Sequence, residues 1–212
     1  CLLLQLALAM RQRSVKEEPK HVRFDAATPL LDRLKRLLPF RVTSAQQRVV
    51  GDIQRDMAST HPMDRLIQGD VACGKTMVAL HAILIACGSG YQAALMVPTE
   101  ILAEQHYLTL RRLLDELGIN TVVIKSGGGK SKRRAATLSE IESGAAQVVV
   151  GTHALIQRSV RFKRLGLAVV QFLGVYWTFA MQLDSRNQGS GPGLGDVMAF
   201  LLANTMPGPL FL

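Results

Sequence analysis

The chain has 212 residues, 48% hydrophobic and 19% charged, which suits one domain with extensions and excludes wholesale disorder. Its net charge of +9 favours a polyanionic partner such as nucleic acid.

Three cysteines without CxxC spacing argue against a disulfide framework and a zinc site, so we expect a cytoplasmic protein. The apolar residues 1–10 are too short to cross a membrane and lack the features of a signal peptide. Because the chain opens with Cys rather than Met, we expect it to be an internal piece of a longer protein.

A helical lead-in is expected over residues 1–40, with its second helix running from Pro29 to Leu38 behind the N-cap Thr28. Helices then alternate with short apolar runs. We predict helices after Thr43 and at 76–86, 100–117 and 133–143, and strands at 66–67, 93–97, 121–124, 147–150 and 167–170. Continuous apolar strands separated by helices indicate a parallel sheet covered on both faces, so residues 41–170 are expected to form one α/β domain.

The last segment, residues 171–212, breaks this alternation. It holds one basic and two acidic residues, against 24 and 14 in residues 1–170. Residues 188–195 resemble a linker, and prolines interrupt the apolar stretch after Asp196. We therefore expect this tail to be poorly ordered.

A phosphate-binding loop of the form G-x-x-x-x-G-K-[ST] lies between a predicted strand and a predicted helix. Its residues are Gly69, Asp70, Val71, Ala72, Cys73, Gly74, Lys75 and Thr76. Glycines let the backbone N–H groups and the helix N-terminus face phosphates. Lys75 would place its charge on the β- and γ-phosphates, and the Thr76 hydroxyl would be a ligand for Mg²⁺. The alternative is a glycine-rich turn that carries Lys-Thr by chance; the surrounding strand and helix favour binding of ATP with Mg²⁺.

Four segments in this order resemble the first motor lobe of the RecG family of superfamily 2 ATP-dependent DNA helicases. They are LPFRVTSAQQ at 38–47, MDRLIQGDV at 63–71, VPTEILAEQH at 97–106 and VGTHALIQ at 150–157. Transcription-repair coupling translocases share this lobe, but Thr99, Glu100, Ile101 and Glu104 favour RecG. These segments disfavour a nucleotide kinase or a transporter ATPase. The resemblance implies a RecA-like fold and an ATP-driven monomeric motor, with no membrane partner, that remodels branched or forked DNA.

The resemblance also assigns roles to residues. Phe40 and Gln46 would recognise adenine, although Thr43 and Gln46 also fit a helix capping box, and the two readings can coexist. Contact with the nucleic-acid backbone would fall to Thr99, Glu100, Gly151, Thr152 and His153, with a helix cap as the alternative for the first pair. Further phosphate contacts could come from basic residues in or beside loops: Lys125, Lys130, Lys132, Arg133, Arg134, Arg158, Arg161, Lys163 and Arg164.

The sequence departs from the family after the strand at 167–170. RecG-like helicases continue with Asp-Glu-Gln-His, whose aspartate helps to hold Mg²⁺ and whose glutamate activates the attacking water. Here the strand continues with Gln171-Phe172-Leu173-Gly174, and the tail resembles no segment of the family, which suggests a frameshift or a truncated gene. The second motor lobe is also expected to be missing. The chain would then at most bind ATP or ADP with Mg²⁺ weakly, without turnover or unwinding of DNA, either as a helicase fragment or as a non-catalytic binding module.

Overall fold

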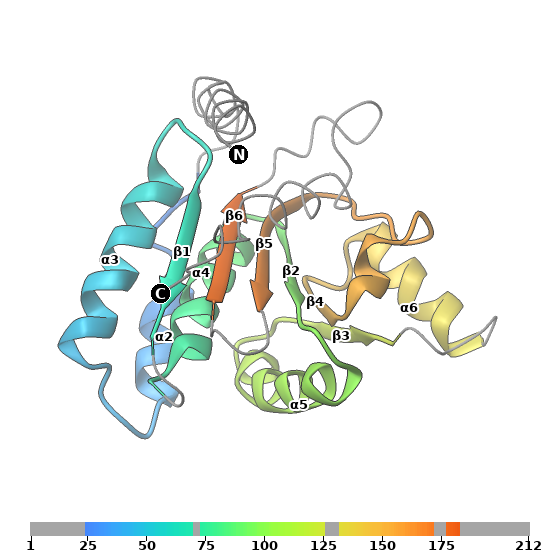
Figure 1. Cartoon of the computed structure of the whole chain (residues 1–212), viewed down its shortest axis with the longest axis horizontal. Coiled ribbons are helices and arrows are strands. Elements are labelled where there is room, and N and C mark those ends of the chain that lie inside the picture. The colour runs from blue at the N-terminus through green and yellow to red at the C-terminus, as the bar shows by residue number, and fades with distance from the viewer. Residues whose placement is uncertain (1–23, 70–72, 126–131, 172–176, 183–212) are drawn as a thin grey trace, which may run out of the picture.

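A computed structural model describes residues 24–69, 73–125, 132–171 and 177–182. These residues form a six-stranded sheet with the strand order β1-β6-β5-β2-β4-β3 (Figure 1). The strands are β1 (Asp64–Gln68), β2 (Gln92–Met96), β3 (Thr121–Ile124), β4 (Val148–Gly151), β5 (Leu165–Gln171) and β6 (Trp177–Gln182). The helices are α2 (Pro29–Leu37), α3 (Ser44–Ala58), α4 (Lys75–Gly88), α5 (Glu100–Glu116), α6 (Lys132–Ser143) and the short 3₁₀ helix η1 (His153–Ile156).

Five of the six strands run in the same direction. Strands β5, β2, β4 and β3 pair in parallel, which confirms the predicted parallel sheet flanked by helices. Strand β6 lies between β1 and β5 and pairs antiparallel with both, so β1 points the same way as β5. The carboxyl ends of β1 to β5 therefore meet at one edge of the sheet, where ligands of open α/β sheets bind.

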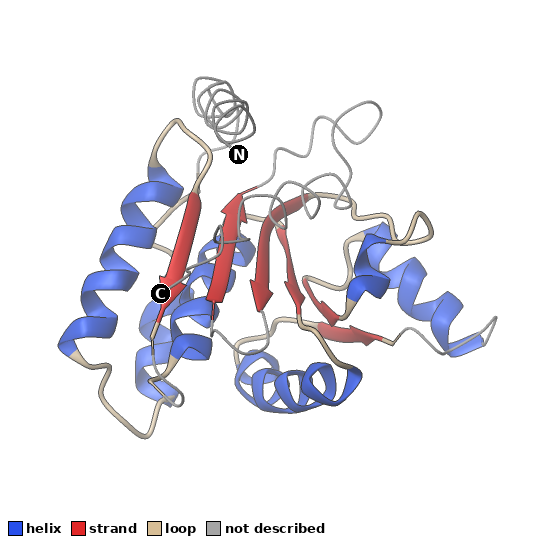
Figure 2. Cartoon of the chain, viewed as in Figure 1, coloured by secondary structure: helices blue, strands red, loops and turns tan. Residues whose placement is uncertain are grey.

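Helices pack around the sheet (Figure 2), and a separate hydrophobic cluster lies on each of its two faces. On β2, Ala93 and Leu95 join the cluster made with α2, α3, α4 and α5, whereas Ala94 and Met96 join the one made with α6 and η1. This alternation follows from the two-residue period of a strand. It explains why β2, β4 and β5 are nearly continuous apolar runs, since these strands are buried on both sides.

Helix α4 is the most deeply enclosed helix of the described residues. Every residue from 78 to 87 is buried, because the sheet covers one side and α2 and α3 pack against the other. This confirms the expectation that an almost wholly apolar helix is enclosed on most sides. Leu31 and Leu34 of α2 belong to the same core cluster, so this part of the lead-in packs into the lobe. No helix of the described residues is both apolar enough and long enough to span a bilayer.

Most predicted elements are present with boundaries shifted by a residue or two. The structure differs in two places. Residues 153–156 form η1, and residues 177–182 form β6 inside the segment expected to be poorly ordered. The strand pairs with β1 over Trp177–Met181 and with β5 over Thr178–Gln182, which gives these residues a place in the sheet. Residues 1–23, where the first helix of the lead-in is expected, and the remainder of the tail, 183–212, lie outside the described residues.

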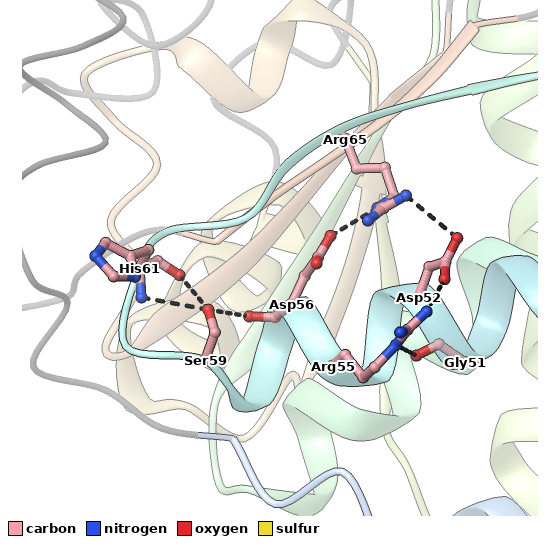
Figure 3. Close-up of polar contacts among 7 residues, drawn as sticks. All are labelled: Gly51, Asp52, Arg55, Asp56, Ser59, His61 and Arg65. Carbon is pink, nitrogen blue, oxygen red and sulfur yellow. Dashed lines mark hydrogen bonds and ion pairs between the residues drawn. The ribbon is translucent and has the colours of Figure 1, made fainter.

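Ion pairs hold β1 against α3 (Figure 3). Arg65 of β1 donates through Nε to Asp56 at 2.6 Å and lies 3.5 Å from Asp52 through Nη1. Asp52 also pairs with Arg55 one turn further along α3. The hydrogen bond to Asp56 is the largest cause of the raised pKa of Arg65. These contacts fix the strand that leads directly into the phosphate-binding loop.

Candidate nucleotide-binding site

The phosphate-binding loop leaves the carboxyl end of β1 and enters the N-terminus of α4. The Lys75 ammonium folds back over the loop, where it donates to the Gly69 carbonyl at 2.7 Å and lies 3.4 Å from the Cys73 sulfur. Lys75 is also the first residue of α4, so its charge adds to the positive end of the helix dipole. A cation and backbone N–H groups at one point favour a phosphate. Asp70, Val71 and Ala72 lie outside the described residues.

Gln46 joins the loop to the start of α3. Its side-chain oxygen accepts from the Thr43 N–H at 2.9 Å, and the Thr43 hydroxyl accepts from the Gln46 N–H, so the capping box is present. Its amide nitrogen donates to the Cys73 carbonyl at 2.9 Å. The same side chain therefore caps one helix and supports the loop before another. It keeps one N–H and one oxygen lone pair for a further partner.

Gly74 is the point where the loop turns into α4. It takes φ +85° as the N-cap of that helix, a left-handed conformation that favours glycine. A Cβ atom at this position would lie 2.2 Å from the Gln46 amide nitrogen. The second glycine of the motif is therefore required by the backbone and by the close approach of Gln46. Phe40, the other expected adenine contact, is 51% exposed in the connection before Thr43.

Thr76 lines a small pocket below the loop, between α4, α5 and the ends of the central strands. Its lining residues are Thr76, Ala79, Ile83, Leu95, His106, Leu110 and Gln171. Gln171 is the last residue of β5 and makes a side-chain hydrogen bond with His106. Burial lowers the pKa of His106, which the Gln171 hydrogen bond opposes.

The donors around Thr76 do not fit a magnesium site. Mg²⁺ is held in nucleotide sites by carboxylates and phosphate oxygens, yet no carboxylate lines this pocket among the described residues. Nor does any group of three or more His, Cys, Asp or Glu side chains in those residues have the geometry to hold a metal ion. Gln171 stands where the sequence resemblance places the metal-binding aspartate.

The expected nucleic-acid contacts lie at the same edge of the sheet. Thr99 caps α5 by accepting from the Leu102 N–H at 3.3 Å, as the alternative interpretation supposed, and Glu100 is exposed beside it. Gly151 ends β4 next to Val97, whose N–H donates to the Gly151 carbonyl at 2.9 Å. The structure thus brings these two segments together.

Thr152 and His153 face different environments. The Thr152 side chain is 2% exposed, and its hydroxyl accepts from the Ala154 N–H as the N-cap of η1. His153 is exposed. Of this pair, only His153 presents its side chain to solvent at the edge where the phosphate-binding loop lies.

The basic residues divide between the two edges of the sheet. Lys125 follows β3 at the carboxyl edge and pairs with Glu104 at 2.8 Å. Arg134 of α6 donates to the Lys125 carbonyl and to the Gln157 side chain. Lys163 and Arg164 precede β5 at the amino edge, where the Arg164 guanidinium lies 4.6 Å from the centre of the Tyr91 ring. These four basic residues therefore lie at two opposite edges of the sheet.

A family model for DEAD/DEAH box helicases matches residues 43–172. This range covers more than half of the chain and includes the loop, Thr99, Glu100 and Gly151 to His153. The chain therefore belongs to the DEAD/DEAH box helicase family.

Similarity to individual proteins narrows this assignment. ATP-dependent DNA helicases RecG are 46% identical over 167 residues in Synechocystis and 50% over 183 residues in Haemophilus influenzae. The matches cover 79% and 85% of this chain but 20% and 26% of those relatives. A solved structure of RecG bound to a three-way DNA junction matches with a TM-score of 0.65 and 40% identity, covering 78% of this chain and 22% of that one. These matches confirm the RecG resemblance and the RecA-like α/β fold.

The matches differ in how far they reach into the tail. The family model ends at residue 172, close to the expected boundary at 170. RecG of Bacillus subtilis matches at 40% identity over 206 residues, which is 97% of this chain and 29% of that relative. That match includes most of residues 171–212, so it does not support the expectation that the family likeness stops at the boundary.

Two features of the site were not predicted from the sequence. The Gln46–Cys73 contact joins residues 27 positions apart, and nothing in the local pattern indicates it. The Gln171–His106 contact joins β5 to α5. The absence of Asp-Glu after β5 marked position 171 as unusual, but His106 as its partner follows only from the fold.

Proposed function

We propose that this chain forms the ATP-binding part of a RecG-type motor that remodels branched or forked DNA, acting as a monomer in the cytoplasm. The single observation that carries the proposal is the loop geometry at the carboxyl edge. Lys75 folds over the loop, Gln46 supports it, and the α4 N-terminus faces the same point. This arrangement is suited to a nucleotide di- or triphosphate.

Each group at the site has a task in holding the nucleotide. Lys75 would move from the Gly69 carbonyl to the phosphates, where its charge offsets theirs. The N–H groups of the first turn of α4 would donate to the same oxygens. The free N–H and lone pair of Gln46 suit an adenine edge, with Phe40 packing beside the base.

The DNA would lie along the edge formed by the ends of β2 and β4. Thr99, Glu100, Gly151, Thr152 and His153 come from these strand ends, and His153 is the exposed side chain among the last three. The support is their shared location and the likeness to a RecG solved on a three-way DNA junction. Backbone N–H groups and side chains at such an edge contact phosphates without reading base sequence.

A second candidate function is nucleotide binding without hydrolysis. The observation that favours it is Gln171 at the end of β5, followed by Phe-Leu-Gly. Neither a carboxylate for the metal nor one to activate water follows this strand. Hydrolysis of ATP in this family uses those two carboxylates. Without them, this chain would keep its affinity for nucleotide and lose turnover.

Isothermal titration of the chain with ADP tests the proposed site. The wild-type chain should bind ADP, and Lys75→Ala should weaken binding at least about tenfold, because it removes the charge that offsets the phosphates. Lys163→Ala is the matched control, since Lys163 lies before β5 at the opposite edge of the sheet. Equal binding by all three proteins would refute the proposed site.

A further inference from the structure

The pocket beside Thr76 contains polar groups that carry no negative charge. Thr76 contributes a hydroxyl from the first turn of α4, and Gln171 contributes an amide from the end of β5. His106 of α5 completes the polar lining. The other lining residues are the apolar Ala79, Ile83, Leu95 and Leu110.

The Gln171 amide is already bound to a neighbour. Its side chain makes a hydrogen bond with His106 across the pocket. Burial lowers the pKa of His106, which favours the neutral form of the imidazole. Gln171 and His106 thus line the pocket together with the Thr76 hydroxyl. In a magnesium site, that hydroxyl would share the metal ion with a carboxylate.

The residues that directly follow β5 in the sequence supply no carboxylate to the pocket beside Thr76. Residues 172–176 are Phe-Leu-Gly-Val-Tyr. By residue 178 the chain is already paired antiparallel with β5, because Thr178 lies opposite Gln171 in the register of β6. None of the residues between Gln171 and Thr178 in the sequence is therefore a carboxylate.

We infer that this phosphate-binding loop binds a nucleoside triphosphate without help from Mg²⁺, because the uncharged side chain of Gln171 lines the pocket with Thr76 at the position where a metal-binding carboxylate would stand. The inference rests on the proposed nucleotide site and concerns its metal dependence alone. Magnesium favours negatively charged oxygen ligands and keeps its water when they are lacking. Affinity then comes from Lys75, the backbone N–H groups and the base contacts.

Titration with the non-hydrolysable ATP analogue AMP-PNP, in 5 mM Mg²⁺ and separately in EDTA, tests this inference. Three proteins are compared: the wild type, Gln171→Asp and Gln171→Asn. Asp and Asn have the same shape, so any loss of the His106 contact or of packing affects both. Only Asp adds a carboxylate. We expect the wild type and Gln171→Asn to bind with similar affinity in both buffers, within about threefold, and Gln171→Asp to bind at least about tenfold more tightly with Mg²⁺.

The possible outcomes separate the inference from the proposed function. A wild-type chain that binds AMP-PNP at least tenfold more tightly with Mg²⁺ would overturn the inference and leave the nucleotide site standing. The same holds if Gln171→Asp gains no more metal dependence than Gln171→Asn, because position 171 would then not face the metal. If the wild type binds no nucleotide in either buffer, the proposed function fails and the inference fails with it.

Discussion

Gly74 shows how one residue determines the shape of the phosphate-binding loop. Its φ of +85° is unfavourable for any residue with a Cβ atom, and that atom would lie 2.2 Å from the Gln46 amide. Gly51 is a natural comparison, since it lies within α3 and a Cβ atom there would meet nothing within 4 Å.

Replacing each of these glycines by alanine should change stability in opposite directions. Gly74→Ala should destabilise the fold by roughly 2 kcal/mol, from the left-handed backbone and the displaced Gln46–Cys73 hydrogen bond. Gly51→Ala should stabilise α3 by roughly 0.5 to 1 kcal/mol. Urea unfolding measures both, and a Gln46→Ala background should reduce the cost of Gly74→Ala to the backbone part, roughly 1 kcal/mol. An unchanged cost in that background would show that Gln46 does not constrain Gly74.

His81 makes stability depend on pH. It is 4% exposed within α4, and its Nδ1 lies 2.7 Å from the Met77 carbonyl. Burial is the main cause of its lowered pKa, the nearby charge of Lys35 lowers it further, and the Met77 hydrogen bond opposes both. Below about pH 6.5 the unfolded chain takes up a proton at this residue before the folded chain does, so the folded state loses stability as the pH falls.

Urea unfolding at pH 7.0 and 5.5 tests this dependence. The wild type should lose stability between the two, and His81→Gln should lose up to about 1 kcal/mol less, because the proton uptake at this site is removed. His106 has a lowered pKa as well and should supply part of what remains. If the variant loses as much stability as the wild type, His81 is not titrating in this way.

Local sequence patterns predicted the caps and the loop but not what holds them together. The Thr43–Gln46 capping box follows from a spacing of three residues, and the loop follows from its motif. The support of Cys73 by Gln46 depends on how α3 packs against α4. That packing is set by apolar side chains such as Ile53 and Met57, which belong to one core cluster with the residues of α4.

At the scale of elements, β6 completes the sheet next to the loop. Among the described residues, β6 is the only strand that pairs with β1. Gln68, the last residue of β1, lies opposite Trp177 in their register, so β6 begins beside the strand end that leads into Gly69. The strand before the phosphate-binding loop is therefore held by the tail on one side.

A proline in the middle of β6 should disturb the nucleotide site. Ala180 lies opposite Arg65 on β1 and Val169 on β5. Ala180→Pro removes an N–H from a strand paired on both sides, which should cost roughly 3 kcal/mol and weaken ADP binding. Ala180→Gly keeps the N–H and should cost about 1 kcal/mol or less. Thermal unfolding and ADP titration measure the two effects, and equal behaviour of the two variants would exclude β6 as a support of the site.

Most strands were predicted because their sequences carry the pattern of a sheet buried on both faces. Strand β6 was not, because the predicted alternation of helices and strands stops at residue 170 and the content of charged residues changes there. Its partners on β1 are more than 100 residues earlier in the chain. Pairing over such a distance depends on the gap that β1 and β5 leave between them, and no local pattern records it.

At the scale of the whole molecule, the chain combines the proposed nucleotide site with a strand end that lacks catalytic acids. Lys75, Gly74 and Gln46 come together at the carboxyl edge, and Gln171 closes the same edge. The chain spans between 20% and 29% of the length of the RecG relatives compared above. We expect this part of the motor to bind nucleotide and not to hydrolyse it.

Steady-state release of phosphate from ATP, in the presence of a three-way DNA junction, tests this claim most directly. The wild-type chain and Lys75→Ala are measured side by side under conditions in which the wild type binds ADP. We expect no phosphate release from the wild type above that of Lys75→Ala. Release that depends on Lys75 and is stimulated by the junction would contradict the claim.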